Sequence, residues 1–470
     1  MKRTLFLLMF SCSVVISAGA QDFDEWFDGR TLRLDYVLAG NSKSQHVYFE
    51  NASSQPWWAG RRSRLTDIIL RGNGQLTLKD RSTGRLLFVH TFSTLFQEWL
   101  ATEEAVKLER AFQTCFNVPM PKKAINVTLT LFNFHGTPVA QLSHDIDPAD
   151  ILIRQLSDNG IPHHYIWKGN TLQTETHAVD SAGKRNFMPS ENVCGDKPDI
   201  VSCIDLAIVA EGYTVGQMGK FYLDCQRVRD ALFAHEPFTS MKHRFNIVAV
   251  AAPSVEQGPS VPHLNRWRLT PTGTHYDTFY TDRYLMTSQM QRLFDILSGV
   301  PFEHAIILVN SDTYGGGGIY NQLTVTTSDH ATFQQVLVHE FGHAYGGLGD
   351  EYYYDDSYES MYPSDTEPWE PNLTTLVDFQ SKWADLLPKG TQVPTPPISL
   401  PNYRNIKTEK ERQQLSSATQ RVGVYEGGGY QSHGVYRPAQ ECRMKINEVE
   451  HFCPVCSRAL VRITDFQTAQ

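Results

Sequence analysis

Beyond its first twenty residues the sequence lacks a long apolar run, a cluster of basic residues and an internal repeat. Because a membrane-spanning helix needs about 20 consecutive apolar residues, no transmembrane segment is predicted. The formal net charge of -9 and the absence of a Lys/Arg cluster argue against nucleic acid as a partner, since phosphate binding needs basic side chains. The composition is otherwise that of an ordinary globular protein, and its 470 residues predict two or three domains.

The N-terminus has the three parts of a secretory signal. Basic Lys2 and Arg3 come first, the mostly apolar run Leu5–Ile16 follows, and small residues occupy positions 18–20. We therefore expect residues 1–20 to be removed and the protein to be exported, whether secreted, periplasmic or held at the cell surface. Lipidation at Cys12 is the alternative, although the preceding Met-Phe-Ser is a poor lipobox.

Cysteine is scarce, and removal of the signal leaves an odd number: Cys115, Cys194, Cys203, Cys225, Cys442, Cys453 and Cys456. In an exported protein, close pairs such as Cys194 with Cys203, or two of the three C-terminal cysteines, could form disulfides. The spacing Cys453-Pro-Val-Cys456 also fits a redox motif or half of a zinc site, but a lone pair of this kind is a weak signal. Structural bonding with Cys442 is the preferred interpretation.

Short apolar or alternating runs separated by turn residues fill the first third of the chain. This spacing predicts an all-β sandwich over residues 21–157, with strands at Leu32–Leu38, His46–Phe49, Leu76–Leu78, Leu86–Phe92 and Ile125–Phe134. No cluster of potential metal ligands, and no nucleophile paired with a base, stands out in this region. We therefore predict an accessory domain.

Residues 158–198 are rich in Asn, Gly, Ser, Pro and Lys, which is typical of a linker between domains. Beyond it, strands alternate with helices: strands at Ile204–Ala210, Phe245–Ala251 and His304–Val309, and helices at Val215–Ala234 and near Ser288–Leu297. Such alternation predicts an α/β domain over residues 199–470 with a mainly parallel sheet.

The chemistry is concentrated at ATFQQVLVHEFGHAY, residues 331–345. On a helix, His339 and His343 share one face about one turn apart and can bind one metal ion. Neutral imidazoles suit Zn²⁺, and Glu340 beside the first ligand can act as the base that takes a proton from a metal-bound water. This pattern predicts hydrolysis of a peptide bond without a covalent intermediate.

A catalytic zinc ion usually has three protein ligands and a water. The helix is followed by glycines at 346, 347 and 349, so the chain is expected to turn back and bring carboxylates toward the metal. Asp350 is the preferred third ligand and Glu351 the alternative.

The segments HEFGHAYGGLGDEY (339–352) and GVYEGGGYQSHGVYRPAQECRM with FCPVC (423–456) resemble the immunoglobulin A peptidase family of zinc metallopeptidases, which is metzincin-like. The resemblance implies a metzincin-like catalytic domain with a twisted mixed sheet, and a non-catalytic domain similar to the N-terminal sandwich. It also implies a protein or peptide substrate, such as a host immunoglobulin. The wider metzincin pattern HExxHxxGxxH has a third histidine where this chain has Gly349, so an acidic ligand is expected instead.

The same resemblance implies two further roles. Met444 matches the methionine turn that lies under the metal in metzincins, although a methionine that fills a core gap is the plainer alternative. Tyr436 is a candidate for stabilising the oxyanion, with a packed aromatic as the equal alternative. The glycines at 315–318 precede an apolar β-rich run, Leu323–Thr327, and we expect them to turn into a sheet edge to which an extended substrate could add.

Two classes of function follow from the sequence. The leading one is a secreted zinc-dependent endopeptidase. The other is a surface binding protein that holds a structural metal and has no peptidase activity. Glu340 favours the first, because a structural metal site has no need of a base beside an open coordination position.

Overall fold

The computed structural model describes residues 23–169, 178–179, 185–186, 199–354, 361–402 and 406–469. The expected signal sequence 1–20, Cys12 and Cys194 lie outside the described residues. So does most of the expected linker 158–198.

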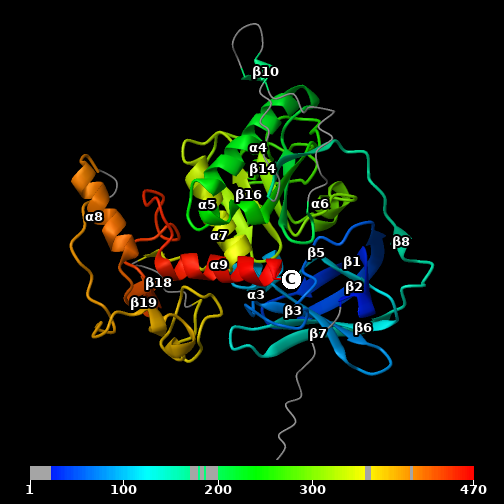
Figure 1. Cartoon of the computed structure of the whole chain (residues 1–470), viewed down its shortest axis with the longest axis horizontal. Helices are drawn as coiled ribbons and strands as arrows, with labels where there is room; N and C mark the ends of the chain where they lie inside the picture. The colour runs from blue at the N-terminus through cyan, green and yellow to red at the C-terminus, as the bar shows by residue number, and fades with distance from the viewer. Residues whose placement is uncertain are drawn as a thin grey trace, which may run out of the picture.

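The N-terminal part is a β domain of two four-stranded sheets, seen at the lower right of Figure 1. One sheet has the order β5-β1-β2-β8, from β1 (Phe27–Gly40), β2 (Gln45–Gln55), β5 (Arg110–Pro121) and β8 (Arg154–Gln155). The other has the order β4-β3-β6-β7, from β3 (Gly74–Asp80), β4 (Leu86–Phe92), β6 (Ile125–Phe132) and β7 (Pro138–Ile146). The short helices α1 (Phe23–Trp26), α2 (Leu95–Trp99) and α3 (Glu103–Lys107) accompany them.

The two sheets share one apolar core, because alternate residues of each strand point inward. In β3, for example, Leu76 and Leu78 are fully buried while Thr77 between them is only partly buried. These strands agree with the expected β architecture. Strands β5 and β7 were not predicted, since polar and small residues interrupt their apolar pattern.

The C-terminal part is mixed α/β around a six-stranded sheet of order β15-β16-β14-β12-β13-β9. Its strands are β9 (His163–Lys168), β12 (Ile204–Glu211), β13 (Phe245–Val250), β14 (His304–Val309), β15 (Gly316–Ile319) and β16 (Leu323–Thr327). The four inner strands run parallel, and the two edge strands pair antiparallel with their neighbours. Strand β9 belongs to the segment expected as a linker, so part of that segment joins the sheet.

Strands β12, β13 and β14 are buried along their whole length because helices cover both faces of the sheet. One face packs on α4 (Met218–Phe233), α5 (Phe238–Met241), α7 (Phe333–Gly346) and α9 (Pro454–Thr468), and the other on α6 (Met290–Ile296). The short 3-10 helices are η1 (Val215–Gln217), η2 (Lys242–Arg244), η3 (Pro262–Leu264), η4 (Phe379–Ser381) and η5 (Ala384–Leu386).

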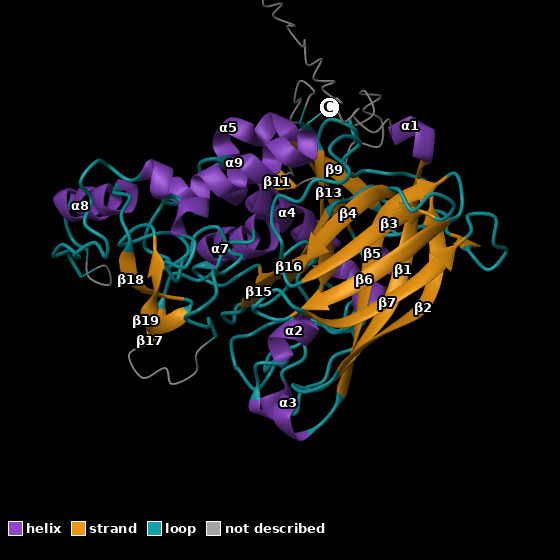
Figure 2. Cartoon of the chain, turned by 90° about the horizontal axis from the view of Figure 1, so that it is seen from below, coloured by secondary structure: helices purple, strands orange, loops and turns teal. Residues whose placement is uncertain are grey.

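A three-stranded sheet of order β17-β19-β18 lies apart from the main sheet, beside α8 (Glu409–Gln420) (Figure 2). It consists of β17 (Tyr353–Tyr354), β18 (Tyr425–Gly428) and β19 (Tyr430–Arg437). A further small pair, β10 (Ala178–Val179) with β11 (Arg185–Asn186), completes the described strands. Through β17 the small sheet is continuous with the chain that leaves α7.

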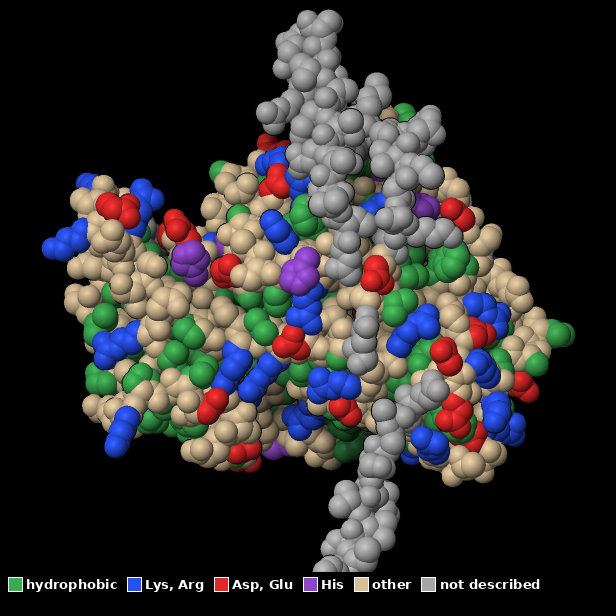
Figure 3. Space-filling model, viewed as in Figure 1, with side chains coloured by type: hydrophobic (Ala, Val, Ile, Leu, Met, Phe, Trp, Pro, Cys, Tyr) green, Lys and Arg blue, Asp and Glu red, His purple; other side chains and the backbone are tan. Residues whose placement is uncertain are grey.

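On the face drawn in Figure 3, basic and acidic side chains are interspersed over the surface. That face has no single-sign basic patch of the kind that nucleic acid requires. Within the described part of the chain, no helix has both the length and the apolarity needed to cross a bilayer.

Candidate metal centre

Helix α7 presents His339 and His343 on the face that turns away from the core. The rest of the helix is apolar and buried against the sheet, and only these two histidines and Glu340 interrupt the buried pattern of its second half. The helix ends at Gly346, and its C-cap, Gly347, adopts a left-handed conformation with φ of 59°. There the amide of Gly347 donates to the His343 carbonyl and the amide of Leu348 to the Gly342 carbonyl. The expected turn back after the second histidine is confirmed.

This turn brings Asp350 to the two histidines. The Nε2 atoms of His339 and His343 lie 3.0 Å apart, and Asp350 Oδ1 lies 3.0 Å from the first and 3.2 Å from the second. The histidine side chains are 14% and 16% exposed and the Asp350 side chain is 7% exposed. One face of the cluster is thus open to solvent while the carboxylate beneath it is buried.

Both imidazoles are held by their other nitrogen. His339 Nδ1 lies 3.0 Å from the Arg443 carbonyl and His343 Nδ1 lies 2.6 Å from the Leu348 carbonyl. Since a carbonyl can only accept, each Nδ1 carries the proton, and in the neutral tautomer each Nε2 presents a lone pair. Three lone pairs, from two nitrogens and Asp350 Oδ1, therefore converge on one point.

The arrangement fits a metal ion. Three donors bound tetrahedrally at about 2.0–2.1 Å lie about 3.3 Å from one another, close to the observed separations. Asp350 Oδ1 is buried and has no hydrogen-bond partner of good geometry among the described residues, as expected of an atom whose partner is a cation. His339, His343 and Asp350 form one of two groups with metal-ligand geometry in the described part of the chain.

Comparison with protein families decides which family this is. The model described as IgA Peptidase M64 matches residues 195–416 and 402–464, and the model described as Peptidase M64 N-terminus matches residues 22–142. The chain belongs to the IgA peptidase M64 family. Membership implies peptidase activity, and the family is one of metallopeptidases. A search of curated proteins finds no match.

In this M64 peptidase the two acidic candidates that follow the helix point in opposite directions. Asp350 faces the histidines, whereas Glu351 is fully buried against Cys456, with Glu351 Oε1 3.1 Å from the Cys456 sulfur. Glu351, the alternative third ligand, therefore lies away from the histidine pair.

The electrostatics follow from burial and from proximity. Burial opposes the charged form of Asp350, but the adjacent histidines outweigh it and hold the pKa of Asp350 well below its usual range. Burial likewise lowers the pKa of His343, yet Asp350 more than compensates and raises that pKa to about 10. Asp350 thus stabilises the protonated form of His343, and His343 stabilises the ionised form of Asp350. A proton on the histidine takes the place that a metal ion would have among the same ligands.

Glu340 lies beside the cluster, against the edge strand β15. A Cβ added at Gly316 would lie 3.0 Å from Glu340 Oε1, so the absence of a side chain at Gly316 leaves room for the carboxylate. Burial raises the pKa of Glu340, with the two histidines partly opposing the shift. Among the described residues none donates a hydrogen bond to this carboxylate, which leaves it available to a ligand.

The tyrosine beside the site is Tyr430, from the small sheet. Its hydroxyl donates to Asp350 Oδ2, and its ring packs edge-on against Tyr352, with 5.2 Å between ring centroids. Tyr436 lies six residues further along β19, where its backbone pairs with Glu426 and Thr374. The structure thus brings Tyr430, and not the expected Tyr436, to the three ligands. The quoted motif contains both tyrosines, but spacing alone could not choose between them.

Met444 is fully buried directly beneath α7. A Cβ added at Gly342 would lie 2.8 Å from the Met444 sulfur, so helix and methionine are in close contact. The Met444 carbonyl accepts from the amide of Glu351 at 2.8 Å, and the preceding residue, Arg443, accepts from His339. The segment around Met444 therefore orients one histidine and fixes the loop that supplies Asp350.

The N-terminal domain also reaches this region, which its sequence did not indicate. Glu98 of α2 accepts a hydrogen bond from the hydroxyl of Tyr284. Burial raises the pKa of Glu98 to about 7. The negative charges of Glu340 and Asp350 add to this rise, whereas the hydrogen bond from Tyr284 and the charge of His343 oppose it. No spacing rule links a glutamate on a five-residue helix to a site more than 200 residues later, so only the fold identifies it.

Proposed function

We propose that the mature protein is a secreted zinc-dependent endopeptidase that hydrolyses peptide bonds in extracellular proteins, with Glu340 as general base. One observation carries the proposal: three metal-ligand lone pairs converge beside the Glu340 carboxylate, which accepts no hydrogen bond from any described residue. A purely structural ion needs no such neighbour. The expected signal sequence supports export.

His339, His343 and Asp350 would hold the zinc ion. When bound there, the ion would lower the pKa of a bound water toward about 7 and would polarise the scissile carbonyl. Glu340 accepts the proton from the attacking water and delivers it to the leaving amine. Its raised pKa suits this transfer, because a carboxylate with a higher pKa takes a proton more readily than one at its ordinary value, and the acid formed can still pass that proton to the more basic leaving amine.

Strand β15 favours a peptide as the substrate. It forms the edge of the six-stranded sheet and lies against α7 at Glu340, so an extended chain that paired with it would cross the site. An isolated bridge from Tyr284 to Gly316 already covers one end of this edge, which restricts pairing to the remainder of the strand. Together with Met444 beneath α7, these features support a metzincin-like arrangement.

The test is Glu340→Gln in the mature protein. We expect hydrolysis of a denatured protein substrate and of immunoglobulin A to fall about 10²- to 10⁴-fold, while the zinc content per chain stays that of the wild type. Glu426→Gln, a change at a half-exposed carboxylate that bonds His433, is the matched control and should keep full activity. Undiminished cleavage by Glu340→Gln would contradict the mechanism. Bound metal without any hydrolysis by the wild type would favour the binding-protein alternative.

A further inference from the structure

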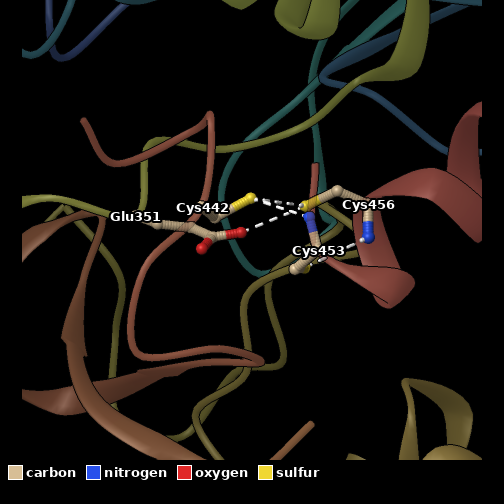
Figure 4. Close-up of side chains that lie close together, drawn as sticks. All are labelled: Glu351, Cys442, Cys453 and Cys456. Carbon is tan, nitrogen blue, oxygen red and sulfur yellow. Dashed lines mark hydrogen bonds between the residues drawn. The ribbon is translucent and has the colours of Figure 1, made fainter. Parts of the chain in front are cut away.

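A second group of metal-ligand side chains lies behind the first, around the residue that follows Asp350. Glu351, Cys442, Cys453 and Cys456 come from three separate segments and turn toward one another (Figure 4). All four side chains are fully buried, and their ligand atoms lie within 4.8 Å of one another. The peptidase mechanism uses none of them.

The distances suit a bound ion better than a disulfide. Tetrahedral zinc, with Zn–S bonds of about 2.3 Å and a Zn–O bond of about 2.0 Å, places sulfurs about 3.8 Å apart and sulfur and oxygen about 3.5 Å apart. The sulfurs of Cys442 and Cys456 lie 3.9 Å apart, and Cys456 Sγ lies 3.1 Å from Glu351 Oε1. A disulfide needs about 2.05 Å between sulfurs, and the three cysteines are free thiols. The expected disulfide with Cys442 is therefore absent from the structure.

The backbone favours thiolates at this position. Cys453 is the N-cap of α9, and its sulfur accepts from the amide of Cys456. The amide of Cys453 in turn lies 3.3 Å from the Cys442 sulfur. Amide hydrogens directed at sulfur, at the positive end of a 15-residue helix, stabilise the deprotonated form that binds metal.

Glu351 supplies the independent sign that a ligand belongs here. Asn372 Nδ2 donates to Glu351 Oε1 at 2.9 Å, but Glu351 Oε2 is buried and has no hydrogen-bond partner among the described residues. A buried carboxylate oxygen without a partner is costly unless a cation or a proton satisfies it. Three sulfurs on one side of the carboxylate make a cation the better match.

The surrounding charges allow a divalent ion. Three thiolates and a carboxylate carry four negative charges, and a divalent cation neutralises two of them. The buried Arg437 and the half-buried Lys445 interact electrostatically with Glu351 and offset the remainder. The Arg437 guanidinium is held in place by the carbonyls of Glu426 and Gly427, each 2.6 Å away.

We propose that Cys442, Cys453, Cys456 and Glu351 bind a second zinc ion in a closed, four-coordinate structural site. Sulfur-rich tetrahedral sites select zinc, and with all four positions filled by protein no place remains for water or substrate. This inference does not depend on peptidase activity.

The second ion would hold in place the two segments that support the first site, the one around Met444 and the loop that carries Asp350. Cys442 lies two residues before Met444, and Glu351 directly follows Asp350. The amide of Glu351 already bonds the Met444 carbonyl, so an ion joining Cys442 to Glu351 would close this loop a second time. Its link to α9 through Cys453 and Cys456 would hold both segments to the helix that packs on α7.

The test is the zinc content of the purified full-length mature protein by mass spectrometry, followed by X-ray absorption at the zinc edge. We expect two zinc ions per chain in the wild type and one in His343→Ala, whose absorption spectrum should show sulfur neighbours at about 2.3 Å. Cys456→Ser should lose the second ion and keep the first. Cys225→Ala, a buried cysteine on α4 outside both groups, is the matched control and should keep two.

Failure of Cys456→Ser to fold would not prevent a decision, because His343→Ala reports on the second site without a change to it. Cobalt added to metal-depleted His343→Ala should give thiolate-to-cobalt charge-transfer bands. The proposal is overturned if His343→Ala contains no metal, if its zinc lacks sulfur ligands, or if peptide mapping of alkylated protein finds Cys442 disulfide-bonded. Wild-type protein that binds two zinc ions but has no peptidase activity would refute the catalytic proposal alone.

Discussion

Two neighbouring residues, Asp350 and Glu351, point into two ligand groups of opposite character. The Asp350 group has two histidines, is partly exposed, and lies beside the Glu340 carboxylate, which accepts no hydrogen bond within the described part of the chain. The Glu351 group has three cysteines and is fully buried. Ligand type and solvent access thus separate a site suited to reaction from a site suited to structure, although one peptide bond joins them.

The largest difference between the two groups should appear on removal of Asp350. We expect Asp350→Ala to reduce kcat/KM at least 100-fold, because loss of a direct ligand costs no less than loss of an outer partner. Zinc content should fall by one ion and the remaining ion should keep its sulfur ligands. Asp365→Ala, at an exposed carboxylate, is the control. Loss of both ions from Asp350→Ala would mean that the two groups do not bind independently.

The next test separates the two tyrosines of β19. Tyr430→Phe removes the hydroxyl that donates to Asp350 Oδ2, so metal affinity or activity should fall about 10- to 100-fold. Tyr436→Phe should leave both unchanged, since that hydroxyl lies elsewhere on the strand. Zinc competition titrations with a fluorescent chelator measure the affinity. An effect of Tyr436→Phe equal to that of Tyr430→Phe would restore Tyr436 as the functional tyrosine.

Sequence alone predicted the parts of the site that one helix determines. His339, Glu340 and His343 follow from helical spacing, and the turn that delivers Asp350 follows from Gly347, because glycine adopts the left-handed conformation at little cost. The strongly apolar strands β12, β13 and β14 were equally predictable from the sequence, since strands buried on both faces are continuous apolar runs.

The parts that sequence did not predict depend on contacts between distant segments. Tyr430 reaches Asp350 only because β19 pairs with β17, and Glu98 reaches the region only because the two domains pack together. The cysteine group was visible as a CxxC pair with a third cysteine, but the sequence could not add Glu351. That residue completes the group through the fold of the loop after α7.

At Gly318 the backbone of β15 lies close against α7, and a substitution there should affect the histidine group alone. A Cβ at Gly318 would lie 2.3 Å from the Glu340 carbonyl oxygen and 3.0 Å from His343 Cβ, so Gly318→Ala forces β15 and α7 apart. We expect a loss of about 1–2 kcal/mol in the free energy of unfolding and weaker binding of the first zinc ion only. Gly219→Ala, where nothing lies within 4 Å, should be neutral or slightly stabilising in urea unfolding.

The smallest expected effect concerns Glu98, an ionisable group of the N-terminal domain that lies near the histidine group. Its folded-state pKa of about 7 exceeds the ordinary value of 4.5, so folding favours its protonated form and its charge costs stability increasingly as pH rises from 4.5 to 7. Glu98→Gln, which still accepts from Tyr284, should therefore stabilise metal-depleted protein more at pH 8.5 than at pH 5.5, by about 1 kcal/mol. Urea unfolding at the two pH values measures the difference.

Because a cation at the histidine group attracts the Glu98 carboxylate, the stability gained in Glu98→Gln should shrink when that group is loaded with zinc and should not respond to metal in the cysteine group. A gain independent of both pH and zinc would mean that Glu98 acts through packing and not through its charge.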